Sequence, residues 1–507
     1  MPALSRYPSA MNSTPPRRRP GPSSRASQQD RGGAERRDGP ARGGGAGGRY
    51  GDGPGQGAQR RPAPAPVRRD LTPVLFLSCA AGVEPLLAEE LAPWLHDLPL
   101  EIIPERGGVR VAPSEQPRRA TDLSFDLSSE LALTMVRAVF LLNLQSRLAQ
   151  RVLWRVALGP YASEDQLYHL ARSVQWDDWI TPRHTLRVDV TARHSPLQSL
   201  NFAGLRIKDA VCDHLRDQFG ERPDVDTRHP DLSLQLHLDG DVAYLYVDTS
   251  GEALFKRGWR EDKGEAPLKE TLAAAMLAAA GWKGRAEDGP LLDPCCGSGT
   301  IAIEAAQIAC GIAPGLQRRF AFERLRPFAA HLGGLQQLKQ QARDRIHAPA
   351  VRIYTGDVSF RMTDFATRNA ERAGVLHTIE FKTADALQRP APAEGGVLMF
   401  NPPYGERIDP KGTGHGGAVR AAREDFVDQQ GASDFFTRLA SHWKRQYGGW
   451  TAWVLSPDMK LPSAMRLKES RRVVMFNGPI ECRLFRFDLV SGSARAQAPS
   501  QADASED

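Results

Sequence analysis

Alternating apolar and polar positions predict a β-hairpin in the first half of the chain. Leucine occupies every second position from 232 to 238, and another β-prone run spans 242–247. Asp239-Gly240 separates the two runs, and this dipeptide is typical of a tight hairpin turn. Residues 205–219 instead carry apolar side chains every three or four positions, which predicts an amphipathic helix. Residues 71 to about 260 are therefore expected to form a mixed α+β region of two small units.

A different pattern begins near residue 265, where strand-like and helical segments alternate. The expected helices are 268–280, 300–310 and 363–373. The expected strands are a short one that ends at Asp293 and longer ones at 352–357, 378–385, 397–401 and 450–456. Two late β segments, 472–477 and 481–490, flank Gly478-Pro479 and predict a closing antiparallel hairpin. This alternation predicts an α/β Rossmann-like domain with a mostly parallel, doubly wound sheet.

The first 70 residues differ from the rest in composition and charge. They contain 14 Arg, no Lys, 5 acidic residues, 13 Gly and 11 Pro, so their net charge is +9 in a chain whose formal charge is +6. With so few large apolar side chains, residues 1–70 and the polar tail 493–507 are expected to be disordered. An Arg-rich arm suits electrostatic contact with phosphate backbones. A solubilising tail, or a start codon placed ahead of a true start at Met11, explains the composition equally well.

The sequence favours a cytoplasmic protein. The longest apolar stretch, 272–282, is about half of the ~20 residues that a membrane-spanning helix needs. The first thirty residues contain no apolar segment followed by a cleavage site. The six cysteines show neither CxxC nor Cys…His spacing, so that neither a disulfide framework nor a metal site is expected.

The first candidate site is the segment Asp293-Pro-Cys-Cys-Gly-Ser-Gly-Thr300. A strand is expected to end on the acid, a turn carries Gly297 and Gly299, and a helix starts at once. Glycines let the backbone approach a ligand closely, and free N–H groups at the helix start favour a negative group on it. The Asp293 carboxylate adds an acceptor for an ammonium, which suits an amino-acid moiety better than a pyrophosphate. Alone, such a turn indicates either a nucleotide-like ligand or a plain tight turn without a ligand.

Two further acids are expected at neighbouring strand ends. Asp357 closes the strand 352–357 and would hold ribose hydroxyls. Asp385 closes the next strand and would lie near an adenine amine. Each acid could also be an ordinary solvated strand end.

A dinucleotide-binding site of the dehydrogenase type is the alternative for the same turn. Gly297, Gly299 and Ala302 fit G-x-G-x-x-G/A, and Glu323 follows 24 residues after Gly299. No strand leads into Glu323, which favours Asp357 as the strand-end acid.

The second candidate site is Asn401-Pro402-Pro403-Tyr404, which follows an apolar strand. Consecutive prolines fix φ and leave carbonyl oxygens at a rigid strand end. The Asn401 side-chain oxygen and the Pro402 carbonyl can accept both hydrogens of a planar –NH2 group, which directs its lone pair towards an electrophile. Tyr404 offers a face on which a base can stack. The motif therefore predicts group transfer to an amine.

Together these residues resemble a class I S-adenosylmethionine-dependent methyltransferase of the amino-methylating type, whose motif is [DNS]-P-P-[YFW]. The resemblance implies S-adenosylmethionine as cofactor and no metal. Its cofactor-binding residues would be Asp293, Pro294, Cys295, Gly297, Gly299, Asp357, Asp385 and Asn401. Its residues at the target amine would be Asn401, Pro402, Pro403 and Tyr404.

The first half of the chain resembles a THUMP RNA-binding domain in the segments 199–211, 222–226 and 248–260. Residues 269–274 and 477–482 continue the likeness. The stretch from about 71 to 490 is similar to the large-subunit rRNA guanine-N2 methyltransferase family, called RlmL-like. The resemblance implies methylation of a guanosine N2 in 23S rRNA, with ribosomal RNA or a large-subunit precursor as partner. It leaves the oligomeric state open, and only the N2 activity is expected, because the chain ends before a second methyltransferase domain.

The implied domain order has five parts. They are a disordered arm (1–70), a ferredoxin-like unit (71–140), a THUMP domain (141–260), the methyltransferase domain (261–492) and a disordered tail (493–507). Two features depart from the family pattern. Asp357-Val358-Ser359-Phe360 stands where D-x-D-P is frequent, which puts any role of the second acid in doubt. The segment 409–431 is longer than the usual loop and is expected to be either a mobile lid or plain disorder.

Two rival functions stay open at this stage. Amine methylation of another RNA, of DNA adenine or of protein glutamine would use the same NPPY chemistry, and only the THUMP-like half disfavours it. A non-catalytic RNA-binding factor for ribosome assembly is disfavoured by the intact motif residues. Glu304 either faces the cofactor or is a surface carboxylate, and Cys295 and Cys296 are expected to line the turn without acting as nucleophiles.

Overall fold

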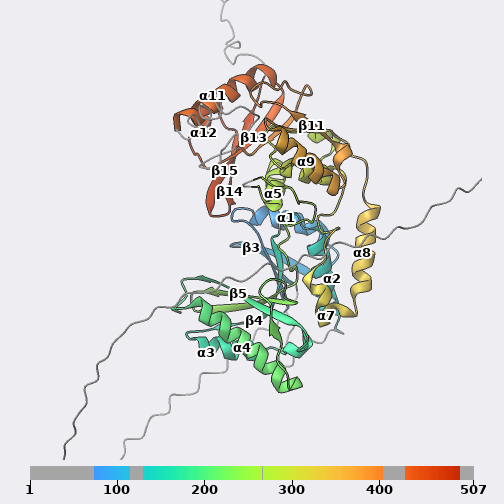
Figure 1. The fold of residues 1–507 in the computed structure, drawn as a ribbon, viewed down its shortest axis with the longest axis vertical. Coiled ribbons are helices and arrows are strands. Elements are labelled where there is room, and N and C mark those ends of the chain that lie inside the picture. Colours follow the sequence, from blue (N-terminus) through green and yellow to red (C-terminus); the bar gives the residue numbers. More distant parts are fainter. Residues whose placement is uncertain (1–72, 115–128, 265–266, 403–428, 491–507) are drawn as a thin grey trace, which may run out of the picture. The chain divides into compact units, whose positions relative to one another are not determined.

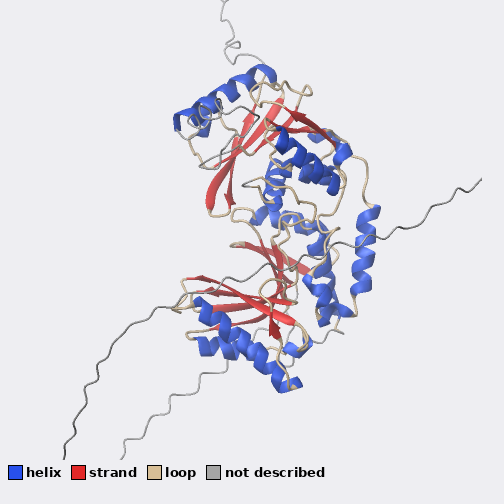
Figure 2. Ribbon diagram, in the orientation of Figure 1, coloured by secondary structure: helices blue, strands red, loops and turns tan. Residues whose placement is uncertain are grey.

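The structure, a computed structural model, describes residues 73–114, 129–264, 267–402 and 429–490. These residues form two β-sheets with their associated helices (Figures 1 and 2). The predicted arm 1–70, the tail 493–507, Pro403 and Tyr404 lie outside the described residues. So does most of the predicted loop 409–431, although a helix begins at Gln429 within it.

The first sheet has eight strands in the order β2-β3-β1-β4-β8-β7-β5-β6. The strands are β1 (Val74–Ser78), β2 (Leu100–Glu105), β3 (Gly108–Pro113), β4 (Arg151–Pro160), β5 (Thr185–Arg193), β6 (Asp224–Val225), β7 (Leu232–Asp239) and β8 (Val242–Asp248). The helices are α1 (Glu84–Leu95), α2 (Glu130–Gln145), α3 (Glu164–Arg172) and α4 (Leu200–Phe219). β1 pairs antiparallel with β4, and β4 pairs antiparallel with β8, so one continuous sheet runs through the two units expected from the sequence.

The predicted hairpin is confirmed, because β7 and β8 pair antiparallel around Asp239-Gly240. The four alternating leucines of β7 are fully buried, since successive side chains of a strand point to opposite faces and these four share the core face. The predicted amphipathic helix is also confirmed as α4.

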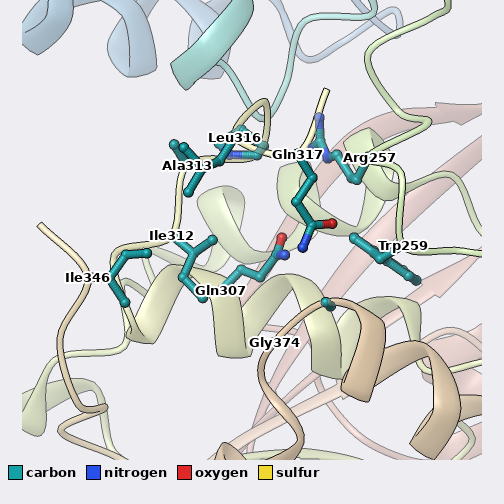
Figure 3. Close-up of a pocket in the computed structure, with 11 residues that line it drawn as sticks. Arg257, Trp259, Gln307, Ile312, Ala313, Leu316, Gln317, Ile346 and Gly374 are labelled. Carbon is teal, nitrogen blue, oxygen red and sulfur yellow. The ribbon is translucent and has the colours of Figure 1, made fainter. Parts of the chain in front are cut away.

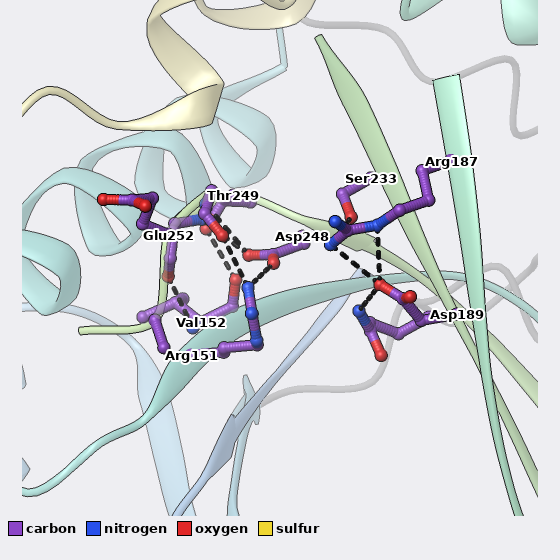
Figure 4. A network of polar contacts seen from close by, with 12 residues as sticks. Arg151, Val152, Arg187, Asp189, Ser233, Asp248, Thr249 and Glu252 are labelled. Atoms are coloured by element: carbon purple, nitrogen blue, oxygen red, sulfur yellow. Dashed lines mark hydrogen bonds and ion pairs between the residues drawn. The ribbon is translucent and has the colours of Figure 1, made fainter. Parts of the chain in front are cut away.

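A polar network fixes the chain as it leaves β8 (Figure 4). The fully buried Asp248 forms an ion pair with Arg151 of β4 and accepts hydrogen bonds from the backbone N–H groups of Ser250 (2.9 Å) and Gly251 (3.2 Å). The Thr249 hydroxyl donates to the Val152 carbonyl (2.7 Å). These contacts hold the start of the segment that leads from β8 into the second half of the chain. A second group of contacts in Figure 4 joins Arg187 of β5 to Asp189 on the same strand and to Ser233 on the neighbouring strand β7.

The second sheet has seven strands in the order β11-β10-β9-β12-β13-β15-β14. The strands are β9 (Leu291–Asp293), β10 (Ile353–Asp357), β11 (Ile379–Thr383), β12 (Gly396–Phe400), β13 (Trp450–Ser456), β14 (Arg471–Asn477) and β15 (Ile480–Asp488). The helices are α5 (Glu270–Ala280), α6 (Thr300–Ala309), α7 (Arg326–Ala329), α8 (Leu332–Asp344), α9 (Phe360–Arg372), α11 (Gln429–Gln446) and α12 (Leu461–Met465). Five strands pair in parallel, and β14 and β15 form the predicted antiparallel hairpin. The predicted Rossmann-like fold is therefore confirmed.

Helices cover both faces of this sheet, as a doubly wound fold requires. Leu291 of β9 belongs to a core that includes Ile301 of α6. The next residue, Leu292, belongs to a separate core with Phe400 of β12 and Trp443 of α11. The rings of Phe400 and Trp443 meet edge to face with centroids 5.9 Å apart. Consecutive strand residues thus point into opposite layers, which explains why Leu291 and Leu292 of β9 are both apolar.

Within the ranges described here, no helix has the length and apolar character needed to cross a bilayer. The same residues include no group of three or more His, Cys, Asp or Glu side chains placed to hold a metal ion. All six cysteines are free thiols.

Candidate functional site

The parallel pairing gathers most of the predicted site residues at one edge of the second sheet. β9 lies between β10 and β12. Asp293, the last residue of β9, is the register partner of Thr355, and Asp357 follows two residues later at the end of β10. Asn401 follows directly after β12. The carboxyl ends of three adjacent strands therefore each carry a predicted site residue, at the edge where ligands bind in folds of this type.

Asp385 lies close to this edge but not in the strand that the sequence predicted. β11 ends at Thr383, which pairs with Asp357, so Asp385 is two residues beyond the strand. Its carboxylate accepts hydrogen bonds from the backbone N–H of Leu387 (2.9 Å) and the side-chain amide of Gln388 (3.1 Å). Polar side chains alternate with alanine over residues 383–386, as they would in a strand. For this reason the sequence predicted a strand that ends two residues too late.

The turn after β9 is held by β10. The N–H of Cys296 donates to the Gly356 carbonyl (2.8 Å), and the N–H of Gly297 donates to Oδ2 of Asp357 (3.0 Å). Both turn glycines have positive φ, 52° at Gly297 and 88° at Gly299. A Cβ atom on Gly299 would also lie 2.9 Å from the Cβ of Ala366 on α9, so this position excludes any other residue.

Neither glycine N–H of the turn is free for a ligand, because each already donates a hydrogen bond within the protein. Gly297 donates to Asp357, and Gly299 donates to the Cys296 carbonyl (2.8 Å). The sequence could not show this, because the acceptor on Asp357 comes from a strand 60 residues away. These two N–H groups shape the turn instead of binding a ligand.

Asp293 is 1% exposed. Its Oδ1 atom accepts one weak hydrogen bond, from the N–H of Cys295 (3.3 Å), and its own carbonyl accepts one from the Thr355 hydroxyl (3.2 Å). Burial raises the pKa of the Asp293 carboxyl to about 8, and the neighbouring charge of Asp357 contributes to the rise. A carboxyl with this pKa becomes an anion when a cationic group is brought beside it.

Asp357 is prepared to accept further hydrogen bonds. Its Oδ1 accepts from the N–H of Ser359 and its Oδ2 from the N–H of Gly297, both at 3.0 Å. Each oxygen keeps a second lone pair for a ligand hydroxyl. Burial raises the pKa of this carboxyl as well, although the two backbone donors oppose the rise.

Cys295 and Cys296 lie in the same turn as neutral thiols. Burial raises the pKa of both well above the ordinary thiol value, and the nearby carboxylates of Asp293 and Asp357 add to the effect. Since a thiolate is the reactive form, neither is suited to act as a nucleophile. Pro294, between Asp293 and Cys295, is buried.

Asn401 carries an unsatisfied acceptor. Its Oδ1 atom is buried and has no hydrogen-bond partner among the described residues. An unpaired buried polar atom costs about 1–3 kcal/mol, so such atoms are rare unless they await a ligand. The preceding residue, Phe400, is fully buried against Trp443, which fixes the strand end from which Asn401 projects. Pro402 follows as a buried residue.

Both expectations for Glu304 are wrong. This residue of α6 is fully buried and faces neither the strand-end site nor solvent. Its carboxylate accepts from Nε of Arg257 (3.0 Å) and from the guanidinium of Arg147 (3.4 Å). The second guanidinium nitrogen of Arg257 donates to the Arg147 carbonyl (2.6 Å), so that two cations and one anion form a closed buried group.

Arg260 is a residue of the site that the sequence reasoning missed. Its guanidinium donates to the hydroxyls of Ser298 (2.6 Å) and Thr300 (2.7 Å) in the turn, and to the carboxylate of Glu270 at the start of α5 (2.8 Å). The sequence placed Arg260 in the THUMP-like segment 248–260. No spacing signal links it to the turn, because 38 residues separate it from Ser298.

Asn369 of α9 also forms hydrogen bonds that hold this turn. Its side-chain nitrogen donates to the Ser298 carbonyl (3.1 Å) and to the Asp262 carbonyl (2.7 Å). The chain segment 257–262 is thus bound to the turn at two points, through Arg260 and through Asn369.

Two family models match the chain. Residues 161–248 match the THUMP domain, and residues 257–416 match the methyltransferase domain of RMKL-like proteins. The chain is therefore similar to a THUMP domain followed by the methyltransferase domain of RMKL-like proteins, and Arg257 and Arg260 fall within the second match. The domain limits given in the sequence analysis, at 140/141 and 260/261, stay predictions.

Curated relatives carry the name ribosomal RNA large subunit methyltransferase K/L. The proteins from Shewanella sp. (strain MR-4) and Shewanella oneidensis are each 36% identical over 383 residues, which is 75% of this chain and 51% of the relative. The chain thus spans about half the length of the curated relatives it matches.

Solved structures show the same fold over most of the chain. A possible methylase from Clostridium difficile 630 matches with a TM-score of 0.65 and 25% identity, over 83% of this chain and 99% of that one. A predicted N6-adenine-specific DNA methylase from Listeria monocytogenes matches with a TM-score of 0.64 and 26% identity, over 82% and 95%. A putative methyltransferase complexed with SAH, SMU.472, matches with a TM-score of 0.67 and 24% identity, over 84% and 100%.

Proposed function

We propose that this chain, a THUMP domain joined to an RMKL-like methyltransferase domain, transfers a methyl group from S-adenosylmethionine to guanine N2 in 23S rRNA. The observation that carries the chemistry is the buried Oδ1 of Asn401, which has no partner among the described residues, at the sheet edge that also carries Asp293 and Asp357. The printed names of the curated relatives support ribosomal RNA as the substrate class. Such a substrate implies a cytoplasmic enzyme.

The residues around the turn fit S-adenosylmethionine, which supplies an electrophilic methyl group on a sulfonium. Asp293 would accept the ammonium of the methionine part, because its buried carboxyl forms no ion pair with any described residue. Asp357 would accept the ribose hydroxyls with the lone pairs that Gly297 and Ser359 leave unused. Asp385, beyond the next strand, would accept the adenine amine. In this proposal Arg260 and Asn369 hold the turn itself.

The target amine would be held by Asn401 and Pro402. Oδ1 of Asn401 and the Pro402 carbonyl accept the two N–H bonds, which withdraws the nitrogen lone pair from the ring and points it at the methyl group. This interaction strengthens as positive charge develops on nitrogen, so it stabilises the transition state more than the ground state. The proton leaves after transfer, and no strong general base is required. A base in RNA reaches such a site by leaving its stack.

DNA adenine is the second candidate substrate. It is favoured by the printed name of the Listeria structure and by the amine chemistry of Asn401, which does not distinguish adenine N6 from guanine N2. The THUMP domain favours RNA.

Labelled methyl transfer tests the proposal. The chain would be incubated with S-adenosylmethionine labelled in the methyl group and with equal amounts of undermethylated 23S rRNA, 16S rRNA or double-stranded DNA. Label in 23S rRNA alone is expected. Label in DNA, or in none of the three, would contradict the proposed substrate.

Cofactor affinity should depend on pH through Asp293. Because burial raises the pKa of this carboxyl to about 8, it holds a proton at pH 6 that must leave when the ammonium binds. Affinity for S-adenosylmethionine is therefore expected to rise about tenfold per pH unit between pH 5.5 and 7.5. Calorimetric titration measures this slope directly. The Asp293→Asn variant should bind weakly with no such slope, and an unchanged slope in that variant would assign the proton to another group.

Arg260→Ala should weaken cofactor binding more than it slows the chemical step. In this variant Ser298, Thr300 and Glu270 lose the hydrogen bonds that the Arg260 guanidinium donates. We therefore expect KM for S-adenosylmethionine to rise about tenfold or more, and kcat to stay within about threefold of the parent value. Arg260→Lys, which keeps the charge, should recover part of the loss. A fall in kcat with an unchanged KM would show that Arg260 acts on the reacting groups.

A further inference from the structure

A cavity of about 210 Å³ lies beside the C-terminal part of α6 (Figure 3). The predicted cofactor turn precedes the other end of this helix. Its walls come from the segment before α5, from α6 at Gln307, and from residues that follow α6, α8 and α9. Gln307 is seven residues after Thr300, or about 10 Å along the helix axis. The cavity is therefore separate from the strand-end site.

Two wall residues present polar atoms with no partner. Nε1 of Trp259 and Oε1 of Gln307 are buried and form no hydrogen bond with any described residue. The two side chains are only 1% and 4% exposed. Among the described residues five buried side-chain atoms lack a partner, and two of the five belong to residues that line this cavity. Nε1 of Trp259 is a hydrogen-bond donor and Oε1 of Gln307 is an acceptor. A ligand with one acceptor and one donor would satisfy both atoms.

The cavity carries no free charge. Arg257 lies in its wall, but its guanidinium is paired with Glu304 and donates its remaining hydrogen bonds to the carbonyls of Leu254 (2.9 Å) and Arg147 (2.6 Å). Apolar side chains, among them Ile312 and Ile346, form much of the remaining wall. A charged ligand would lose its hydration without a counter-ion here, so that a neutral molecule is selected.

Gln317 covers the polar end of the cavity. Its side chain extends towards the carboxamide of Gln307 (Figure 3) and is held by one hydrogen bond, from its Nε2 to the Arg372 carbonyl (3.1 Å). Gln317 itself is exposed. Rotation of this one side chain breaks a single hydrogen bond and opens the buried carboxamide to a ligand.

A single water does not account for the cavity. A water molecule occupies about 30 Å³ in the liquid and needs two to four polar partners, whereas this cavity is about 210 Å³ and largely apolar. We propose that it binds a neutral planar ring with a hydrogen-bond donor and acceptor on one edge, the chemistry of a nucleobase. This inference does not rest on the proposed function.

Uracil is the probe, because its ring places a carbonyl beside an N–H. Saturable binding to the full chain is expected, measured by saturation-transfer NMR. Gln307→Leu and Trp259→Phe should each weaken it about tenfold, as should 1,3-dimethyluracil, which lacks the donors. Gln336→Leu, an exposed position on α8, is the matched control and should bind as the parent does. An oligouridine that displaces uracil would identify RNA as the source of the base, and one that fails to displace it would identify a free base.

Stability separates this proposal from a folding defect. Gln307→Leu removes an unpaired buried acceptor, so its melting temperature should equal or exceed that of the parent. Absence of saturable uracil binding by the parent chain would overturn the proposal. Equal uracil affinity in the parent, Gln307→Leu and Trp259→Phe would overturn it as well.

Discussion

Asn401→Ala is expected to lower kcat for methyl transfer by roughly 10²–10³-fold and to leave the affinity for S-adenosylmethionine within about threefold. The reason is the position of Asn401 Oδ1, a buried acceptor at the end of β12 that has no partner in the part of the chain that the structure describes. Its loss removes a contact to the amine that strengthens as charge develops on nitrogen. The turn that would hold the cofactor is built by Asp293, Gly297 and Asp357, and the substitution leaves these in place.

Single-turnover kinetics measure the transfer step, and calorimetric titration measures cofactor binding in the same variants. Asn401→Asp is the matched control, because it keeps an acceptor oxygen at the same position and should retain more activity than the alanine variant. Loss of transfer together with loss of cofactor binding in Asn401→Ala would contradict the division of roles between the two strand ends.

Glu304→Ala should cost about 3–5 kcal/mol of unfolding free energy, the usual effect of removing one partner from a buried ion pair. Glu304 is fully buried and neutralises Arg257, which is also buried, while Arg147, two residues after the end of α2, donates to it. Without the carboxylate the guanidinium of Arg257, whose side chain is 1% exposed, lies beside that of Arg147 with no counter-ion.

Urea denaturation gives the free energy of unfolding for this comparison. Glu252→Ala is the control, since its ion pair with Lys256 is exposed and its loss should change stability by less than about 1 kcal/mol. A change below about 1 kcal/mol in Glu304→Ala would show that the buried group is not needed for stability.

Local chemistry made much of the fold predictable. The alternating leucines of 232–238 and the Asp239-Gly240 turn specify a hairpin without reference to any distant residue. The strand–helix alternation after residue 265 specifies a doubly wound sheet, and strand ends in such a sheet converge at one edge. For this reason the sequence could predict that Asp293, Asp357 and Asn401 gather together.

Features that depend on distant pairing could not be predicted. The single eight-stranded sheet arises because β1 pairs with β4 across more than seventy residues of chain, and neither strand marks its partner in the sequence. Glu304 looks like an ordinary helix carboxylate until Arg147 and Arg257 are seen around it. The contacts of Arg260 with Ser298 likewise have no local signature.

The central proposal is methylation of guanine N2 in 23S rRNA, and identification of the product nucleoside tests it most directly. Undermethylated 23S rRNA would be treated with the chain and S-adenosylmethionine, digested to nucleosides and analysed by mass spectrometry. N2-methylguanosine, absent from the reaction with Asn401→Ala, is the predicted result. N6-methyladenosine, any other methylated nucleoside, or no methylated product would contradict the proposal.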